Sequence, residues 1–236
     1  MVTSGNSYDE NVTDATYPVY PYDERIIDTA REQQRSLCSV YRVPETMVVM
    51  GRGSKADQEL RLDRIALDAV PVYRRRGGGC TVVLDSGNIV VAFATPQHGI
   101  SDSGLLIRQH ADYIISSLQQ LGLSGLKRQG ISDIVQRQEN RLLKISGSCV
   151  YRPKGLFFFS ATLLVGADLA LIDRYTTHPP REPTYRQGRS HEDFVGNLAL
   201  PENNSLNIDT LIADLADPIQ TTSSYTLAEG RAFENS

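Results

Sequence analysis

The sequence predicts an α+β protein in which mixed or antiparallel sheets are flanked by helices. Short runs rich in β-branched residues come in sequential pairs, and helical patterns lie between these pairs rather than after every strand. A doubly wound parallel sheet would need a helix after each strand, so the arrangement argues against that class. With 40% apolar and 22% charged residues among 236, the composition is that of an ordinary globular protein.

The first half of the chain predicts one helix and five strands. Asp23 is a residue type that caps helices well, so we expect a helix from Asp23 through Arg35. Pro44 and Glu45 form the turn between the first two strands, and a polar segment opens after the second strand. The predicted strands cover residues 39–43, 46–50, 69–73, 81–84 and 88–94.

The second half predicts a long helix, a hairpin and several shorter elements. Apolar residues recur at steps of three and four positions over about residues 104–121, which predicts an amphipathic helix, and Gly122 suits the position after its end. Residues 133–136 and 141–148 form a predicted hairpin, and a reversal at residues 152–155 leads into a strand that ends near residue 165. Further helices are predicted from Asp168, from about His191, and over residues 209–216.

Composition limits the domain organisation and the partners. We expect one main domain over residues 21–220, a flexible N-terminal arm at residues 1–20 and a polar C-terminal tail at residues 221–236. A formal net charge of -4 and a pI of about 5.6 argue against a nucleic-acid binder. The longest apolar run is too short for a membrane span, and no secretory signal pattern opens the sequence, so we expect a cytoplasmic protein. Cys38, Cys80 and Cys149 are widely spaced, which favours reduced thiols over a disulfide framework or a zinc site.

Three arginines followed by three glycines lie between two predicted strands, at residues 74–79. Consecutive glycines let the backbone approach a ligand closely, and their N–H groups can form a concavity that binds anions. The neighbouring arginines carry permanent charge suited to phosphate or carboxylate. The segment is neither a P-loop nor GxGxxG, and by itself it also fits a basic connector. Its position inside a sheet favours the anion site.

Lys144 lies in the second strand of the predicted hairpin. If Leu143 and Ile145 face one side of this strand, Lys144 faces the other, where small Ser and Gly neighbours leave room for a bound molecule. A lysine can hold a carboxylate and a phosphate as negative charge builds between them. Most strand lysines are solvated surface groups, so these residues alone leave both readings open.

Together, the two segments resemble motifs of the lipoate–protein ligase family, which shares its fold with biotin–protein ligases and octanoyltransferases. The first family motif reads roughly Arg-Arg-x-Ser-Gly-Gly-Gly-Ala/Thr-Val-x-His-Asp-x-Gly-Asn and aligns without a gap with residues 74–88. Gly77, Cys80 and Leu84 replace its Ser, third Gly and His. The second motif, Asn-Asp and then Lys-x-Ser-Gly-Ser/Asn-Ala, aligns with residues 132–133 and 144–149, where Ser132 and Cys149 are departures.

A third family motif, His-Gly-Thr-Leu-Leu, aligns with residues 160–164 and keeps its last three residues. Residues 48–52 also resemble the family's Val-Val-x-Gly-Arg strand end. The resemblance covers about residues 25–198. It implies the biotin/lipoate-ligase catalytic-domain fold, in a compact form without a large C-terminal accessory domain.

The resemblance also implies a two-step reaction. ATP and lipoate form lipoyl-adenylate and pyrophosphate, and the acyl group then passes to a lysine of a lipoyl-carrier protein. Lys144 is the implied catalytic residue, and Asp133 is implied to help hold Mg²⁺ or the nucleotide phosphates. The implied nucleotide and lipoyl-adenylate contacts are Arg74, Arg75, Gly77, Gly78, Gly79, Cys80, Thr81, Val82, Val83, Asp133, Ser146, Gly147, Ser148, Ala161 and Thr162.

An octanoyltransferase of the same fold is the main alternative. Such enzymes carry the acyl group on a cysteine, but residues 157–159 are phenylalanines and residues 125–132 hold no cysteine, so neither expected position is filled. A biotin–protein ligase is less consistent because its Gly-Arg-Gly-Arg-x-Gly-Arg loop is absent. A non-catalytic binder of the lipoyl carrier stays open, since Leu84, Ser132 and Ser160 depart from the family pattern. Arg181 and Arg186 are predicted to contact the carrier or the nucleotide.

Overall fold

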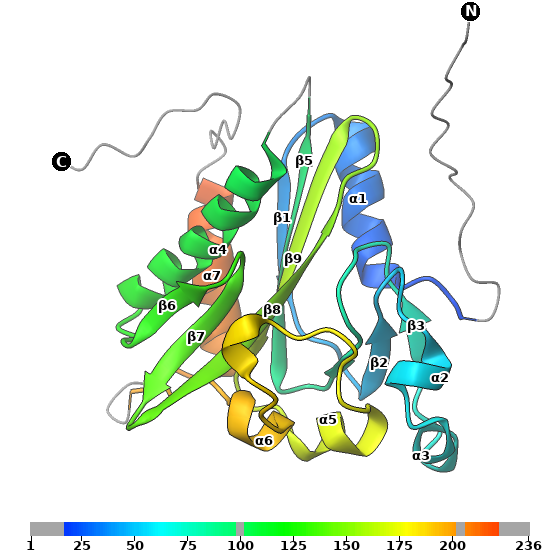
Figure 1. The fold of residues 1–236 in the computed structure, drawn as a ribbon. Coiled ribbons are helices and arrows are strands. Elements are labelled where there is room, and N and C mark those ends of the chain that lie inside the picture. Colours follow the sequence, from blue (N-terminus) through cyan, green and yellow to red (C-terminus); the bar gives the residue numbers. More distant parts are fainter. Residues whose placement is uncertain (1–16, 98–101, 202–205, 222–236) are drawn as a thin grey trace, which may run out of the picture.

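The computed structural model describes residues 17–97, 102–201 and 206–221 of the chain. Two sheets of different size, packed together with helices, form this part of the molecule (Figure 1). The α+β class with helices flanking a largely antiparallel sheet is therefore confirmed.

Six strands form the larger sheet, and every neighbouring pair in it is antiparallel. The longest ladder, of nine residue pairs, joins the second and third strands in the interior of the sheet. In spatial order the strands are β1 (Leu37–Tyr41), β5 (Asn88–Pro96), β9 (Leu156–Leu164), β8 (Arg141–Tyr151), β7 (Asp133–Gln138) and β6 (Leu126–Gln129).

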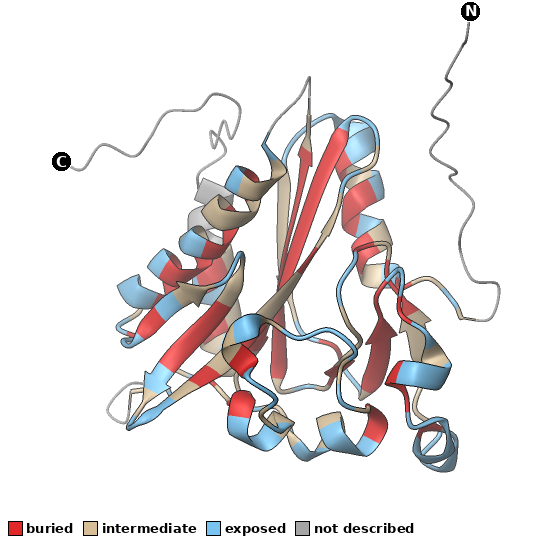
Figure 2. Ribbon diagram, in the orientation of Figure 1, coloured by how far each residue is buried: buried red, intermediate tan, exposed pale blue. Residues whose placement is uncertain are grey.

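Helices cover both faces of the larger sheet. The helices α4 (Ser103–Gln120) and α7 (Ile208–Thr221) pack on one face, and α1 (Pro21–Gln33) packs on the other (Figure 1). In β9, Phe157 and Phe159 belong to the core under α4, whereas Phe158 belongs to the core under α1. A strand covered on both faces is apolar at consecutive positions, which explains the run of phenylalanines. Figure 2 shows buried residues along these central strands and exposed residues on the outer sides of the helices.

Three short strands form the smaller sheet, in the order β3 (Val72–Arg74), β2 (Met47–Met50) and β4 (Val82–Leu84). The pair β2–β3 is parallel, whereas β2–β4 is antiparallel. A parallel pair needs a crossover connection, and two short helices form it, α2 (Ala56–Glu59) and α3 (Leu62–Leu67). The helix α5 (Ala170–Tyr175) packs Tyr175 onto this sheet beside Val48 and Met50.

After α5, residues 176–196 return from the small sheet to the β7–β8 hairpin, and we call this stretch the crossing segment. It contains the 3₁₀ helix η1 (Thr184–Arg186) and the helix α6 (His191–Phe194), yellow to orange in Figure 1. Backbone hydrogen bonds tie it at both ends: Thr177 N donates to Glu59 O at 3.0 Å, and Gly196 N donates to Lys144 O at 3.1 Å. The crossing segment therefore links the small sheet to the strand of Lys144.

Several predicted elements are confirmed. The helix α4 begins after Asp102, whose carboxylate accepts a hydrogen bond from the Gly104 N–H, and Gly122 follows its end with a φ of 87°. The β7–β8 hairpin, the strand β9 and the helices after β9 also lie where they are expected. No helix within the described ranges is long and apolar enough to cross a membrane.

The structure also corrects several expectations. Asp23 is not a cap but lies buried in the first turn of α1, which begins at Pro21 because proline suits the start of a helix. Pro44 and Glu45 do not join a strand pair, because β1 and β2 belong to different sheets. The strand β6 and the helices α2 and α3 fall in stretches for which the sequence predicted no helix or strand.

The last residues of the predicted N-terminal arm belong to the folded body. Tyr20 N donates to Arg74 O at 2.9 Å, and Val19 forms a parallel bridge with the same residue, so residues 17–20 belong to the folded body. The rest of the arm and the predicted polar tail beyond residue 221 lie outside the described residues.

Candidate functional site

Two buried arginines hold the backbone around the candidate site: Arg75 binds the Gly-rich loop that connects β3 to β4, and Arg74 binds the segment that follows β2. Arg75 is 7% exposed, and its Nη2 donates to the carbonyl oxygens of Gly78 and Cys80, both at 2.8 Å. Arg74 is equally buried, and its Nη1 donates to two backbone carbonyls after β2, at 3.0 and 2.9 Å. Both guanidinium groups thus bind backbone oxygens. These contacts fix the backbone around the site. Part of the positive charge that the sequence predicts for binding an anionic ligand therefore binds the protein's own backbone.

Glycine is required where the loop meets the end of β2. A Cβ atom on Gly51 would lie 1.9 Å from the carbonyl oxygen of Gly79, well inside any contact distance. Gly79 has a φ of 93°, which side-chain-bearing residues rarely adopt, and a Cβ there would lie 3.1 Å from Arg75 Nη2. The close approach of loop and strand depends on both glycines.

Glu59 of α2 is a buried carboxylate that the sequence did not reveal, and it holds the far end of the loop. Its Oε2 accepts hydrogen bonds from the Thr81 N–H at 2.9 Å, the Thr81 hydroxyl at 2.8 Å and the Ser54 hydroxyl at 2.9 Å. The Thr81 N–H, implied to contact the adenylate, is therefore engaged inside the protein. Beyond it, Val82 and Val83 pair with β2 in the small sheet. A lone glutamate in a polar stretch carries no motif, so its role emerges only from the fold.

Lys144 lies at a β-bulge in β8. Neighbouring residues of β7 pair with Lys144 and Ser146, so Ile145 is the extra residue between them. Ile145 belongs to the core under α4, and Lys144 points to the opposite face, as the sequence predicts. The bulge shifts the alternation, so Gly147 faces the same side as Lys144. A Cβ on Gly147 would lie 3.3 Å from Lys144 Cε, and the glycine therefore leaves room for the lysine side chain.

The bulge divides the predicted site residues between the two faces of the sheet. Ser146 pairs with Leu163, and Ser148 pairs with Ala161; both partners belong to the core under α4. Directly opposed residues share a face, so the two serines and Ala161 point away from Lys144. Gly147 pairs with Thr162 on the face of Lys144. The structure therefore groups Gly147 and Thr162 with the lysine and separates the other three from it.

The ammonium of Lys144 is paired with Asp133, the other predicted polar residue of the hairpin. Lys144 Nζ lies 2.8 Å from Asp133 Oδ1, and the two side chains are 22% and 18% exposed. The second carboxylate oxygen, Oδ2, accepts a hydrogen bond from the Tyr185 hydroxyl at 2.7 Å. Burial and the charge of Asp133 raise the pKa of Tyr185, so this hydroxyl remains protonated and donates. Lys144 and Asp133 were both predicted as site residues from the sequence, whereas Tyr185 was not.

The Gly-rich loop packs against β8 a few residues beyond Lys144. Gly78 N donates to Val150 O at 3.3 Å, and a Cβ on Gly77 would lie 2.7 Å from the Cys149 sulfur. A small pocket between this loop and the crossing segment is lined by Cys80, Thr81 and His191, among others. The two predicted motifs therefore border one region, which the crossing segment covers.

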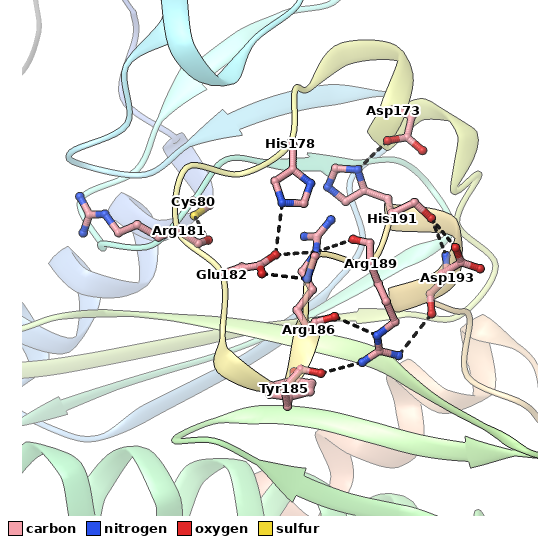
Figure 3. A network of polar contacts seen from close by, with 12 residues as sticks. Cys80, Asp173, His178, Arg181, Glu182, Tyr185, Arg186, Arg189, His191 and Asp193 are labelled. Carbon is pink, nitrogen blue, oxygen red and sulfur yellow. Dashed lines mark hydrogen bonds and ion pairs between the residues drawn. The ribbon is translucent and has the colours of Figure 1, made fainter.

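Figure 3 shows the polar network that fixes the crossing segment. Arg186 is 4% exposed; its Nε donates to Arg189 O at 2.9 Å, and Glu182 lies 3.5 Å away. Arg189 donates in turn to the carbonyl oxygens of Tyr185 at 2.8 Å and Arg186 at 3.0 Å. Arg186 was expected to contact the carrier or the nucleotide, and its burial leaves almost no side-chain surface for a carrier protein. Arg181 is exposed, and its carbonyl oxygen accepts from the Cys80 thiol at 3.5 Å.

The three cysteines are free thiols that burial keeps protonated. Burial raises the pKa of Cys149 to about 11 and that of Cys38 to about 12. Burial and the nearby Glu59 carboxylate raise the pKa of the Cys80 thiol, although the Arg75 and Lys144 charges act in the opposite direction. A thiol acts as a nucleophile in its thiolate form, so none of these environments activates one.

The family resemblance implies that Asp133 helps to hold Mg²⁺ or the nucleotide phosphates. Both of its carboxylate oxygens are engaged, one by Lys144 and one by Tyr185. Among the described residues, no group of three or more His, Cys, Asp or Glu side chains lies close enough to hold a metal ion. Mg²⁺ usually binds one or two carboxylates together with substrate phosphates, and at Asp133 it would have to displace one of these partners.

Comparison with known proteins places these features in a family. Residues 17–220 match the family described as "Lipoyl protein ligase A/B catalytic domain". The chain is 34% identical over 149 residues to lipoate-protein ligase A of Blochmanniella pennsylvanica, covering 61% of this chain and 40% of that protein. It is 28% identical over 174 residues to lipoate-protein ligase A of Psychrobacter cryohalolentis, covering 73% of this chain and 47% of that protein. The chain thus spans less than half the length of these curated relatives.

Solved structures share the fold at lower identity. The bipartite lipoate protein ligase of Thermoplasma acidophilum, described with its E2 lipoyl domain, has a TM-score of 0.69 at 20% identity and covers 86% of this chain and 79% of its own. A lipoate-protein ligase A bound with ATP has a TM-score of 0.66 at 22% identity, covering 85% of this chain and 77% of its own. These structures establish the predicted fold, and the family match extends over most of the sequence. The chain belongs to the lipoyl protein ligase A/B catalytic domain family.

Proposed function

We propose that the protein attaches lipoate to a lysine of a lipoyl-carrier protein, using ATP and passing through lipoyl-adenylate. The observation that carries this proposal is the half-buried ammonium of Lys144, held at a strand bulge beside a Gly-rich loop. Such a site offers a fixed positive charge and backbone donors rather than a nucleophile. The names of the relatives, the ATP-bound ligase and a T. acidophilum protein with bound lipoic acid agree with these substrates.

In the first step of the proposed reaction, a carboxylate oxygen of lipoate attacks the α-phosphorus of ATP and pyrophosphate leaves. In the second step, the carrier amine attacks the acyl carbonyl and AMP leaves. Negative charge develops between the acyl oxygen and the α-phosphate in both steps. An ammonium that is fixed in a partly desolvated site stabilises this charge more strongly than one in water. Lys144 performs this role in both steps.

The other predicted contacts divide into residues that border the substrate and residues that shape the site. Gly147 and Thr162 share the face of Lys144, and Gly77, Gly78, Gly79 and Cys80 form the loop beside it, so we propose these as substrate contacts. Arg75 and Thr81 act by fixing the Gly-rich loop, and Arg74 acts by fixing the segment after β2. Val82, Val83, Ser146, Ser148 and Ala161 support the sheet. Mg²⁺ would enter with the nucleotide, and no step depends on a metal ion bound by the protein itself.

The thiols support a ligase over an octanoyltransferase that works through a thioester. Burial raises the pKa of Cys80 and Cys149, so neither is present as a reactive thiolate at neutral pH. Reduced thiols also agree with the proposed cytoplasmic location, because disulfides are rare in that compartment.

The proposal is tested by incubating the protein with ATP, lipoate and candidate apo-carrier domains and following the mass of each carrier. We expect one lipoyl group per modified carrier, and only when ATP is present. Lys144→Ala should reduce the rate by about two to three decades, comparable with the loss of one oxyanion donor. Lys127→Ala, which removes an exposed strand lysine, is the matched control and should keep the wild-type rate. A stable acyl-thioester on Cys80 or Cys149 would instead support the transferase.

A further inference from the structure

The contacts of Asp133 extend from the β7–β8 hairpin to the crossing segment. One carboxylate oxygen pairs with Lys144 Nζ at 2.8 Å, and the other accepts the Tyr185 hydroxyl at 2.7 Å. Lys144 and Asp133 belong to neighbouring strands, whereas Tyr185 comes from η1, about forty residues later. The carboxylate thus sits between two donors that approach from different elements.

The Tyr185 side chain is itself held in place. Its ring packs on Phe194 of α6 with 5.3 Å between the centroids, and its carbonyl oxygen accepts from Arg189 Nη2 at 2.8 Å. The guanidinium groups of Arg186 and Arg189 lie 4.9 and 5.1 Å from the Phe194 ring centre. Cations bind the faces of aromatic rings, so these contacts fix α6 and η1 as a unit. The position of the Tyr185 hydroxyl is therefore well defined.

The same unit contacts Lys144 at two further points. Gly196 N donates to Lys144 O at 3.1 Å, and Lys144 Nζ lies 5.9 Å from the Phe194 ring centre. The crossing segment consequently holds the lysine through its backbone, its ammonium and its carboxylate partner. A lysine side chain has four rotatable bonds and loses its preferred orientation unless its partners are fixed. Asp133 is fixed on one side by the ion pair and on the other by Tyr185.

We propose that Tyr185 is a positioning residue for Lys144 and acts through the Asp133 carboxylate. The inference rests on the proposed function, because it assigns the tyrosine to the charge-stabilising step performed by Lys144. Tyr185 touches no reacting atom in this account. It keeps the carboxylate, and through it the ammonium, in the orientation that the developing charge requires. Small misplacements of a catalytic group cost large factors in rate, so the hydroxyl has a measurable effect.

The test compares Tyr185→Phe with the wild-type protein in lipoate-dependent pyrophosphate release. The substitution removes the hydroxyl and keeps the ring that packs on Phe194, so the fold is preserved, which thermal unfolding checks. We expect kcat to fall about tenfold, since a hydrogen bond to a charged acceptor corresponds to roughly one to two decades. The KM for ATP should change less than about twofold, because substrate binding does not involve the hydroxyl.

Tyr175→Phe is the matched control. The Tyr175 hydroxyl donates to Asp68 at 2.9 Å, and Asp68 pairs with Arg174, so a tyrosine hydroxyl again donates to a carboxylate that is paired with a cation. This second triad lies between α3 and α5. Losing its hydroxyl should leave kcat unchanged within about twofold if the effect belongs to the Lys144 site.

A double-mutant cycle distinguishes positioning through Asp133 from a general structural effect. In an Asp133→Ala background, measured in single turnover, Tyr185→Phe should cost less than about twofold because its partner is already absent. The role of Tyr185 is overturned if Tyr185→Phe keeps the wild-type kcat, or if the full loss persists in the Asp133→Ala background. Absence of lipoate-dependent pyrophosphate release in the wild-type protein would overturn the proposed function, and this role with it. The measurement on the wild-type protein therefore distinguishes failure of the Tyr185 role from failure of the proposed function.

Discussion

Removing the carboxylate of Glu59 should release the end of the Gly-rich loop. Its Oε2 accepts three hydrogen bonds, two from Thr81 and one from Ser54, all at 2.8 to 2.9 Å. A hydrogen bond to a charged acceptor contributes about 1.5–3 kcal/mol, and three bonds on one oxygen do not add fully. We therefore expect Glu59→Ala to lower the free energy of unfolding by about 3 kcal/mol.

The same substitution should weaken nucleotide binding, because the loop that borders the site is no longer held at Thr81. We expect about a tenfold higher Kd for ATP, measured by calorimetry, together with the loss of stability measured by urea unfolding. Glu59→Gln keeps the size and one acceptor oxygen, so its losses should be smaller, about 1 kcal/mol. Glu45→Ala removes an exposed glutamate and should change stability by less than about 0.5 kcal/mol.

Glu59→Ala with unchanged stability would contradict the role of the carboxylate as the anchor of the loop. Lost stability with unchanged ATP affinity would leave the anchor intact but would separate the loop from the nucleotide site. The two measurements together therefore test the structural and the functional part of the reasoning independently.

Three further predictions concern α1, the end of β2 and the Gly-rich loop. Burial raises the pKa of Asp23 from 3.8 to about 7, so the folded state binds a proton more tightly than the unfolded state. The stability of the protein therefore falls as the pH rises between these two values. Asp23→Asn should remove this pH dependence and stabilise the protein at pH 8 by up to about 4 kcal/mol, measured by urea unfolding from pH 4 to 8. A stability of Asp23→Asn that follows the wild type at every pH would refute it. Gly51→Ala should cost about 3 kcal/mol or more, since its Cβ would lie 1.9 Å from Gly79 O, and equal urea midpoints for the two proteins would contradict that contact. Cys80→Ser should keep ligase activity within about twofold, because it preserves the loop backbone and removes only a protonated thiol; a loss of activity together with loss of an acyl-thioester in the mass spectrum would refute this assignment.

Local patterns in the sequence predicted much of the fold correctly. The amphipathic spacing of α4, the glycine after its end and the β7–β8 hairpin are features of short stretches, and they lie where expected. The division into two sheets was not predictable in the same way. Pro44 and Glu45 look like a hairpin turn, yet β1 pairs with β5 and β2 pairs with β3 and β4. The partner of a strand depends on residues far away in the sequence.

The candidate site shows the same limit. Lys144, Asp133 and the Gly-rich loop were found from residue type and family resemblance. The bulge at Ile145 could not be predicted, because it depends on how β8 pairs with its partner strand. This bulge turns the side chains of Ser146 and Ser148 to the face opposite Lys144. Tyr185 reaches the site through a loop whose path has no periodic signal. The residues that support a site are thus harder to predict than the residues proposed to perform its chemistry.

The central claim is that Lys144 stabilises the formation of an acyl-adenylate. Its most direct test is the exchange of labelled pyrophosphate into ATP, which requires reversible adenylate formation and no carrier protein. We predict that the wild-type protein catalyses this exchange when lipoate is present, that Lys127→Ala does so equally well, and that Lys144→Ala is slower by about two to three decades. Exchange that does not depend on lipoate, or that proceeds at the wild-type rate in Lys144→Ala, would contradict the claim.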